Sequence, residues 1–256
     1  MKKKLTKFKD KIIKNLKRIK EEKMISKYFK DNRLFLVYVL VCVLNSTLLR
    51  IFTMPTMENY LSFKPIVADI AVVTIIGSFS YLFKGKKRYV YLLVWAIIFT
   101  AICTINSAYY TFYTSFASVS MLSLTQYIGE VGDAVVENVL QLKDLVYIFP
   151  LIFFIYYYHR LAKKDKYKIY TKEKRLKKFK NTIIIGAIIL VLFIVSLSSL
   201  EISRFVKQWN REYIVMRFGI YLYQGNDIVA SIRPQISAMF GYDDAKKEFT
   251  EYYKDR

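Results

Sequence analysis

The feature that most constrains this chain is the alternation of long apolar runs with short blocks rich in lysine and arginine. Each run is close to the ~20 residues that an α-helix needs to cross the hydrocarbon core of a bilayer. The alternation predicts an all-α, polytopic membrane protein. Five transmembrane helices are expected in a domain over 34–200, at about 34–53, 65–83, 89–107, 145–162 and 182–200.

The fourth of these spans departs most from a regular apolar run. Pro150 interrupts it, and its end is nearly all tyrosine, a residue enriched at membrane interfaces.

The distribution of charge predicts an orientation. Three segments carry net charges of +10, +4 and +9, namely 1–33, 84–88 and 159–181. The alternate segments carry 0, −3 and +1, namely 54–64, 108–144 and 201–256. Basic loops stay in the cytoplasm, so we expect a cytoplasmic N-terminus and an extracytoplasmic C-terminus in a bacterial plasma membrane. Because the basic blocks flank apolar spans, the net charge of +21 does not indicate nucleic-acid binding.

Segment 1–33 precedes the first span and has apolar residues at helical spacing among its lysines. This pattern is typical of a basic amphipathic helix on anionic lipid, and equally of a solvated tail that only sets the topology.

Residues with catalytic or metal-binding chemistry are sparse. The single histidine, His159, lies in a basic loop, and Cys42 and Cys103 lie inside apolar runs as buried thiols. No phosphate-binding glycine loop or metal-ligand cluster is present in the sequence. We therefore predict no catalytic residue, metal or cofactor in this chain.

Two ionisable residues fall inside predicted spans, where charge marks a functional candidate. Arg50 and Asp69 both lie near the outer ends of their spans. Three alternatives are open: Arg50 and Asp69 form a mutual salt bridge, the Arg50 side chain extends to the membrane interface, or Arg50 binds a lipid phosphate. With Tyr109, Tyr110 and Tyr113, which begin the outside loop, Arg50 and Asp69 are our candidate headgroup-binding residues.

The outside segments 108–144 and 201–256 are partly apolar. The first has an apolar helical stripe, which indicates either a surface-lying helix or a lid over the bundle. The second begins an aromatic stretch near 209–228, predicted to sit in the interface with its charges facing water. Its candidate connector residues are Tyr213, Arg217, Phe218, Tyr221, Tyr223 and Asp227.

Four stretches carry a resemblance to a known family over roughly 34–256. They are FKGKKRYVYLLVW, NSAYYTFYTSFASVSMLSLTQYIGEVGDAV, KDLVYIF and REYIVMRFGIYLYQGND. Their order and spacing resemble the N-terminal transmembrane domain of lipoteichoic acid synthases, the sulfatase-like phosphoglycerol transferases of Gram-positive bacteria. Some relatives carry Arg where this chain has Thr111. If that Arg contacts a lipid phosphate, another group must do so in this protein, and Arg50 is the candidate.

The resemblance implies a function for the whole enzyme. An extracytoplasmic catalytic domain, with a threonine nucleophile and a divalent metal such as manganese, is expected to follow the connector and to use phosphatidylglycerol. No residue of this sequence corresponds to a catalytic position. This chain is therefore expected to anchor and position that domain at the outer leaflet, and to present the lipid.

Two other functions stay open. The first is a stand-alone membrane scaffold that binds envelope proteins. The second, with weaker support, is a lipid flippase or transporter. Transporters usually show internal repeats and several polar groups within their spans.

Overall fold

The computed structural model describes residues 32–57, 62–118, 141–164, 170–208 and 210–232, and this part of the chain is helical with no strand. The predicted all-α class is confirmed. The elements are the Asn32–Thr53 helix, α3 (Lys64–Ser78), η1 (Phe79–Leu82), α4 (Gly85–Tyr113), η3 (Leu142–Tyr147), α6 (Ile148–Lys164), α7 (Lys172–Val195), α8 (Ser199–Val206), α9 (Arg211–Phe218) and a helix over 220–232. The predicted N-terminal amphipathic helix, most of the outside loop and the end of the tail lie outside the described residues.

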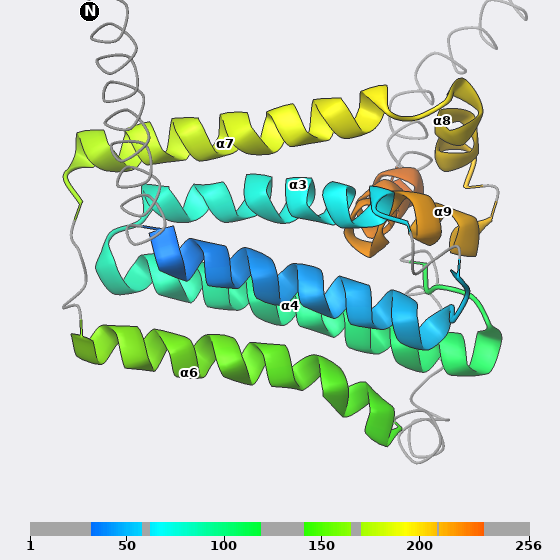
Figure 1. Ribbon diagram of the computed structural model, residues 1–256, viewed down its shortest axis with the longest axis horizontal. Coiled ribbons are helices and arrows are strands. Elements are labelled where there is room, and N and C mark those ends of the chain that lie inside the picture. The colour runs from blue at the N-terminus through cyan, green and yellow to red at the C-terminus, as the bar shows by residue number, and fades with distance from the viewer. Residues whose placement is uncertain (1–31, 58–61, 119–140, 165–169, 209, 233–256) are drawn as a thin grey trace, which may run out of the picture.

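The long helices lie side by side and alternate in direction along the chain (Figure 1). α3 packs against α7, and α4 packs against α6. At the first interface, a Cβ atom added to Gly186 of α7 meets the Ile75 side chain at 2.8 Å. A small residue is required there because the two helices approach closely, as is common between membrane helices.

The outer surface of the bundle is strongly apolar. Only 17% of the most apolar part of α7 is buried within the bundle, and Ile184, Ile188, Val191 and Leu192 are among its exposed side chains. An apolar surface of this length is suited to lipid rather than water.

Four of the described helices are long and apolar enough to cross a membrane: Asn32–Thr53, Lys64–Leu82, Gly85–Tyr113 and Lys172–Val195. The predicted count of five is therefore not confirmed. The remaining candidate, α6, has 17 residues and a basic C-terminal end. It reaches about 26 Å, less than the ~30 Å of a hydrocarbon core. The preceding η3 extends it by about 12 Å, and both η3 and α6 contact α4.

α4 and α7 differ most from the predicted spans. α4 runs from Gly85 to Tyr113, so the first residues of the expected outside loop are helical. α7 ends at Val195 and not at residue 200, because the chain turns at Ser196 and restarts as α8. The Ser196 hydroxyl donates to the Phe193 carbonyl at 2.6 Å and stabilises that turn.

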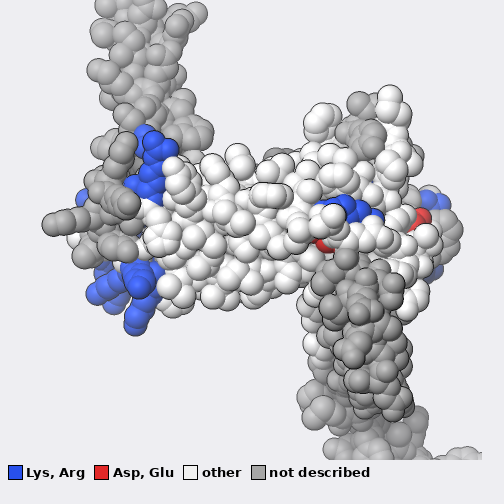
Figure 2. Space-filling view, turned by 90° about the horizontal axis from the view of Figure 1, so that it is seen from below, with Lys and Arg blue, Asp and Glu red and all other residues white. Residues whose placement is uncertain are grey.

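The two ends of the bundle differ in charge. The turn from η1 into α4 and the start of α7 lie at one end, which we call the basic end. The larger groups of Lys and Arg side chains in Figure 2 lie there, and the smaller number at the opposite end is accompanied by acidic side chains. α8 and α9 lie at the opposite end, which we call the connector end (Figure 1). The alternation of net charge between successive loops, which predicted an orientation, thus corresponds to the two ends of one bundle.

Candidate functional site at the connector end

The aromatic stretch near 209–228 folds back into the bundle instead of extending away from it. Its first half is α9, which Asn210 caps by accepting a hydrogen bond from the Tyr213 amide at 2.9 Å. α9 ends at Gly219, and the chain continues at once as the helix over 220–232. α9 packs against α3, so this segment is part of the helical core.

Gly219 makes this reversal sterically feasible. Its φ is +78°, a backbone conformation that residues with a Cβ rarely adopt. A Cβ atom at this position would collide with the Asp69 carboxylate. Glycine therefore serves two purposes at this position, since it permits the turn and allows the connector backbone to approach α3.

The Tyr221 side chain contacts two other helices, the first helix and α4. Its hydroxyl donates to the Cys42 carbonyl at 2.6 Å and lies 3.5 Å from the Cys103 sulfur. Its ring packs on Phe99, with centroids 4.3 Å apart. Cys42 is in the middle of the first helix, so the connector extends well into the bundle.

The intramembrane charges predicted from the sequence meet at this same place. Arg50 is 2% exposed and Asp69 is 1% exposed, and the two interact electrostatically. The Asp69 carboxylate accepts hydrogen bonds from the Ser46 hydroxyl and, at 3.3 Å, from the Tyr221 amide. A buried carboxylate is costly unless its charge and lone pairs are satisfied, and these contacts offset part of that cost.

A second set of polar contacts fixes the start of the long outside segment to the connector. Asp227, 2% exposed, accepts from the Ser118 hydroxyl at 2.7 Å. The Ala117 carbonyl accepts from Tyr223 at 3.1 Å and from Gln224 at 3.0 Å. The expectation that the charges of this stretch face water is therefore wrong for Asp227.

Of the remaining predicted connector residues, Phe218 packs inward and Tyr213 packs against a neighbouring helix. Phe218 is buried and stacks on Phe205 of α8, with centroids 4.3 Å apart. The Tyr213 ring lies under the Arg204 guanidinium at 5.0 Å, and Arg217 lies in the last turn of α9. The aromatic side chains that suggested a position in the membrane interface thus pack against other parts of the protein.

The three candidate tyrosines at the end of α4 have different surroundings. Tyr109 and Tyr113 stack with centroids 4.5 Å apart, and Tyr113 is 65% exposed. The Tyr110 hydroxyl donates to Glu212 of α9 at 2.7 Å. Tyr110 thus contacts the connector and Tyr113 is exposed, and headgroup binding by these residues together with Arg50 and Asp69 stays a prediction.

Sequence reasoning missed two buried polar residues next to this site. Ser107 donates to the Asp144 carboxylate at 2.6 Å and accepts from the Tyr147 hydroxyl at 3.2 Å. Asp144 also accepts from the Gln141 amide in a capping box that starts η3. The signal available was the Asp144 position itself, at the start of an apolar run, where an acidic residue favours the beginning of a helix.

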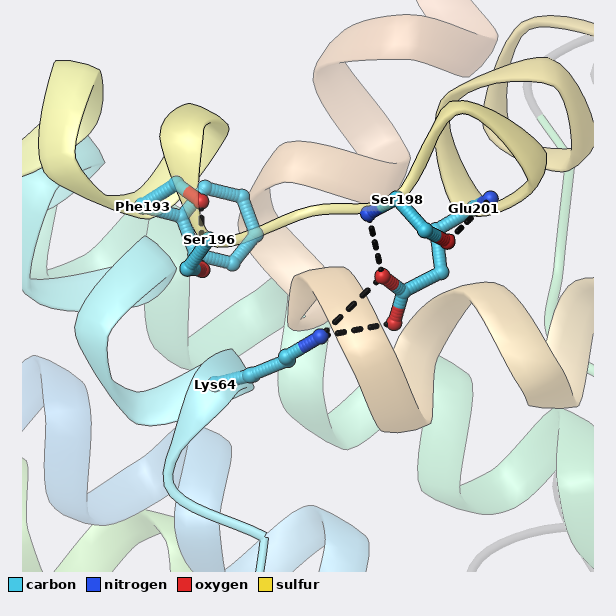
Figure 3. Close-up of polar contacts among 5 residues, drawn as sticks. All are labelled: Lys64, Phe193, Ser196, Ser198 and Glu201. Atoms are coloured by element: carbon cyan, nitrogen blue, oxygen red, sulfur yellow. Dashed lines mark hydrogen bonds and ion pairs between the residues drawn. The ribbon is translucent and has the colours of Figure 1, made fainter.

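α8 is attached to α3 by an ion pair (Figure 3). Lys64 lies 2.8 Å from one carboxylate oxygen of Glu201 and 3.1 Å from the other. Glu201 also closes a capping box with Ser198. Burial raises the pKa of Glu201. The hydrogen bonds and charge of Lys64 and the hydrogen bonds of Ser198 together lower it by more, so the pKa of Glu201 lies below its usual range. A carboxylate with a lowered pKa stabilises the fold at pH values above the pKa that it has in the unfolded chain. This contact therefore persists at neutral pH and is lost only as the pH falls through the lowered pKa.

The described residues contain no group of three side chains that could hold a metal ion. The predicted absence of a metal or cofactor in the chain stays a prediction.

These features define a class: a helical membrane domain whose juxtamembrane segment is docked into one end of its own bundle. Residues 11–239 match the model of the family described as the lipoteichoic acid synthase N-terminal domain, and the chain belongs to that family. It is also similar to a lipoteichoic acid synthase from Staphylococcus saprophyticus subsp. saprophyticus, with 25% identity over 181 residues. The match covers 69% of this chain and 27% of that protein, so the chain spans well under half the length of this relative. No solved structure matches. The apolar helices and the family together make this a membrane protein.

Proposed function

We propose that this chain is the membrane domain of a sulfatase-like phosphoglycerol transferase of the lipoteichoic acid synthase type. In this proposal it anchors an extracytoplasmic catalytic domain and holds it at a fixed height above the outer leaflet of a Gram-positive plasma membrane. The observation that carries the proposal is the docked connector, in which Gly219, Tyr221 and Asp227 attach the chain to three other segments. A domain that follows such a connector starts from a rigid base rather than from a free tether.

The orientation in this proposal places the basic end in the cytoplasm and the connector end outside. The larger groups of Lys and Arg at the basic end support it, because basic residues are retained on the cytoplasmic side (Figure 2). It requires α6 to cross the membrane together with the four longer helices. The antiparallel course of α4, α6 and α7 supports that requirement (Figure 1).

Presentation of phosphatidylglycerol is the second part of the proposal. An apolar groove of about 410 Å³ opens between the first helix and α6, lined by residues that include Leu44, Leu48, Val146 and Phe149. It lies in the half of the bundle nearer to the connector end, and an acyl chain of a phospholipid fits its chemistry. The exposed Tyr113 is suited to the headgroup level at the same end.

The test replaces residues 211–232 in the intact enzyme by a flexible glycine–serine linker of equal length. We expect the amount of glycerol phosphate polymer per folded enzyme to fall by about tenfold or more, because positioning contributes strongly to effective concentration. The catalytic domain released by proteolysis must remain folded and equally active on a soluble substrate in both proteins. Polymer synthesis unchanged by the linker would show that the connector does not position the catalytic domain.

A further inference from the structure

A cluster of cations and aromatic rings lies at the basic end, far from the connector. Tyr81 of η1 is buried, and the guanidinium carbon of Arg88 lies 4.1 Å from its ring centroid. The Lys178 ammonium lies 5.8 Å from the same centroid. Asn32 accepts hydrogen bonds from both the Tyr81 hydroxyl and Lys178, each at 2.9 Å. Two cations are thus held against one aromatic ring, an attractive arrangement for each of them.

Two arginines of this cluster have donors with no acceptor. Nε and Nη2 of Arg88 and Nε of Arg175 are buried and, among the described residues, have no hydrogen-bond partner. Arg175 uses another nitrogen to donate to the Leu82 carbonyl at 2.6 Å, which places it beside η1. A buried donor without an acceptor costs roughly 1–3 kcal/mol, and more when it is charged. Both guanidinium groups therefore keep at least one buried nitrogen without an acceptor among the described residues, beside the same short helix.

The start of α4 adds further positive charge that has no acidic partner in its first turn. Lys84 is its N-cap residue and makes no side-chain cap, and no acidic residue lies in the first turn. Lys86, Lys87 and Arg88 follow directly. A helix N-terminus carries partial positive charge, so cations there are unfavourable and an anion is favourable.

The general preference for basic residues on the cytoplasmic side does not explain these arginines. That preference is satisfied by cations in water, as for the exposed side chains of Lys86, Lys87, Lys174 and Lys177. It gives no reason for guanidinium nitrogens to be buried without acceptors around η1. A bound anion gives that reason.

We propose that Arg88 and Arg175 bind the phosphate group of an anionic lipid headgroup at the basic end. A guanidinium presents forked donors that match phosphate oxygens, and basic pockets between membrane helices hold lipid headgroups. Phe79, Leu82 and Phe83, beside the cluster, are each about 40% exposed and apolar. These side chains favour a lipid over a free phosphate, because they can lie along its acyl chains. This site is separate from the proposed function, which concerns the opposite end.

The test measures binding of dioctanoyl-phosphatidylglycerol to the purified 256-residue chain in detergent. We expect the double variant Arg88→Gln/Arg175→Gln to weaken binding by about tenfold or more, since it removes the charge-assisted hydrogen bonds. The matched control is Lys86→Gln/Lys177→Gln, which removes the same net charge from exposed positions. We expect it to change the affinity by no more than about twofold. Dioctanoyl-phosphatidylcholine and inorganic phosphate are expected to bind more weakly than dioctanoyl-phosphatidylglycerol to the natural chain.

Equal weakening by both double variants would assign the binding to diffuse charge and overturn the proposal. If neither double variant changes the affinity, the proposal is also overturned, because the lipid then binds elsewhere, for example at the connector end. Inorganic phosphate or the phosphatidylcholine binding as tightly as dioctanoyl-phosphatidylglycerol would contradict an anionic lipid site. Circular dichroism of each variant without lipid checks folding. If the double variant is not folded, Arg175→Lys keeps the charge, removes the fork and must still weaken binding.

Discussion

We expect Gly219→Val to destabilise the chain by roughly 3 kcal/mol or more, which would leave little folded protein in detergent. Valine is strained at a φ of +78°, and its Cβ collides with the Asp69 carboxylate, which is itself held by Ser46 and Tyr221. The carboxylate cannot move aside without leaving those donors. The measurement is the Tm of the purified chain, followed by circular dichroism.

Gly225→Ala is the matched control for this prediction. Gly225 lies in the helix over 220–232, and nothing lies within 4 Å of an added Cβ. Alanine is preferred to glycine inside a helix by up to about 1 kcal/mol, so this variant is expected to be as stable as the natural chain or slightly more so. A Gly219→Val chain with the Tm of the control would mean that the connector is not docked against α3.

The second large effect is expected at the buried charges. Arg50→Ala and Asp69→Ala should each destabilise the chain by about 3–5 kcal/mol, because either change leaves the other charge buried without its electrostatic partner. In the intact enzyme, polymer synthesis should then fall in proportion to the amount of folded protein. Arg33→Ala, at an exposed position of the same helix, is the control and should have little effect on either.

These variants separate two of the three roles that the sequence left open for Arg50, the structural partner of Asp69 and the ligand of a lipid phosphate. A structural partner of Asp69 predicts equal losses of protein and of polymer, and a double variant less unstable than the sum of the single ones. A lipid-binding Arg50 predicts normal protein levels with little polymer. The second result would contradict the structural role, which we favour because Arg50 is only 2% exposed.

The long helices were predictable because each is an uninterrupted apolar run. The placement of Arg50 and Asp69 at one end was also predictable, since helix direction alternates and each lies near the end of its span. The helix bounds were less so. α7 ends at Val195 because Ser196 and Ser198 make a turn and a cap, and this local hydrogen bonding does not alter the apolar pattern that extends to residue 200.

The docking of the connector could not be predicted from its composition. A stretch with charges among aromatics is equally suited to a membrane interface and to a polar gap between helices. The contacts that decide between them join residues far apart in the chain, such as Tyr110 with Glu212 and Ser118 with Asp227. The one local signal was Gly219 between two short helical stretches, which indicates a turn but not its partner.

Hydrogen–deuterium exchange of the unmodified chain in nanodiscs tests most directly whether the connector is part of the helical bundle. We expect the amides of Ile214, Gly219, Tyr221 and Tyr223 to exchange as slowly as those in the middle of α4, and much more slowly than those of α8. Each of these four amides donates a hydrogen bond, and the side chains of Ile214, Tyr221 and Tyr223 are buried. If these four amides instead exchange as fast as those of α8, the connector is a flexible tether and the docked arrangement is contradicted.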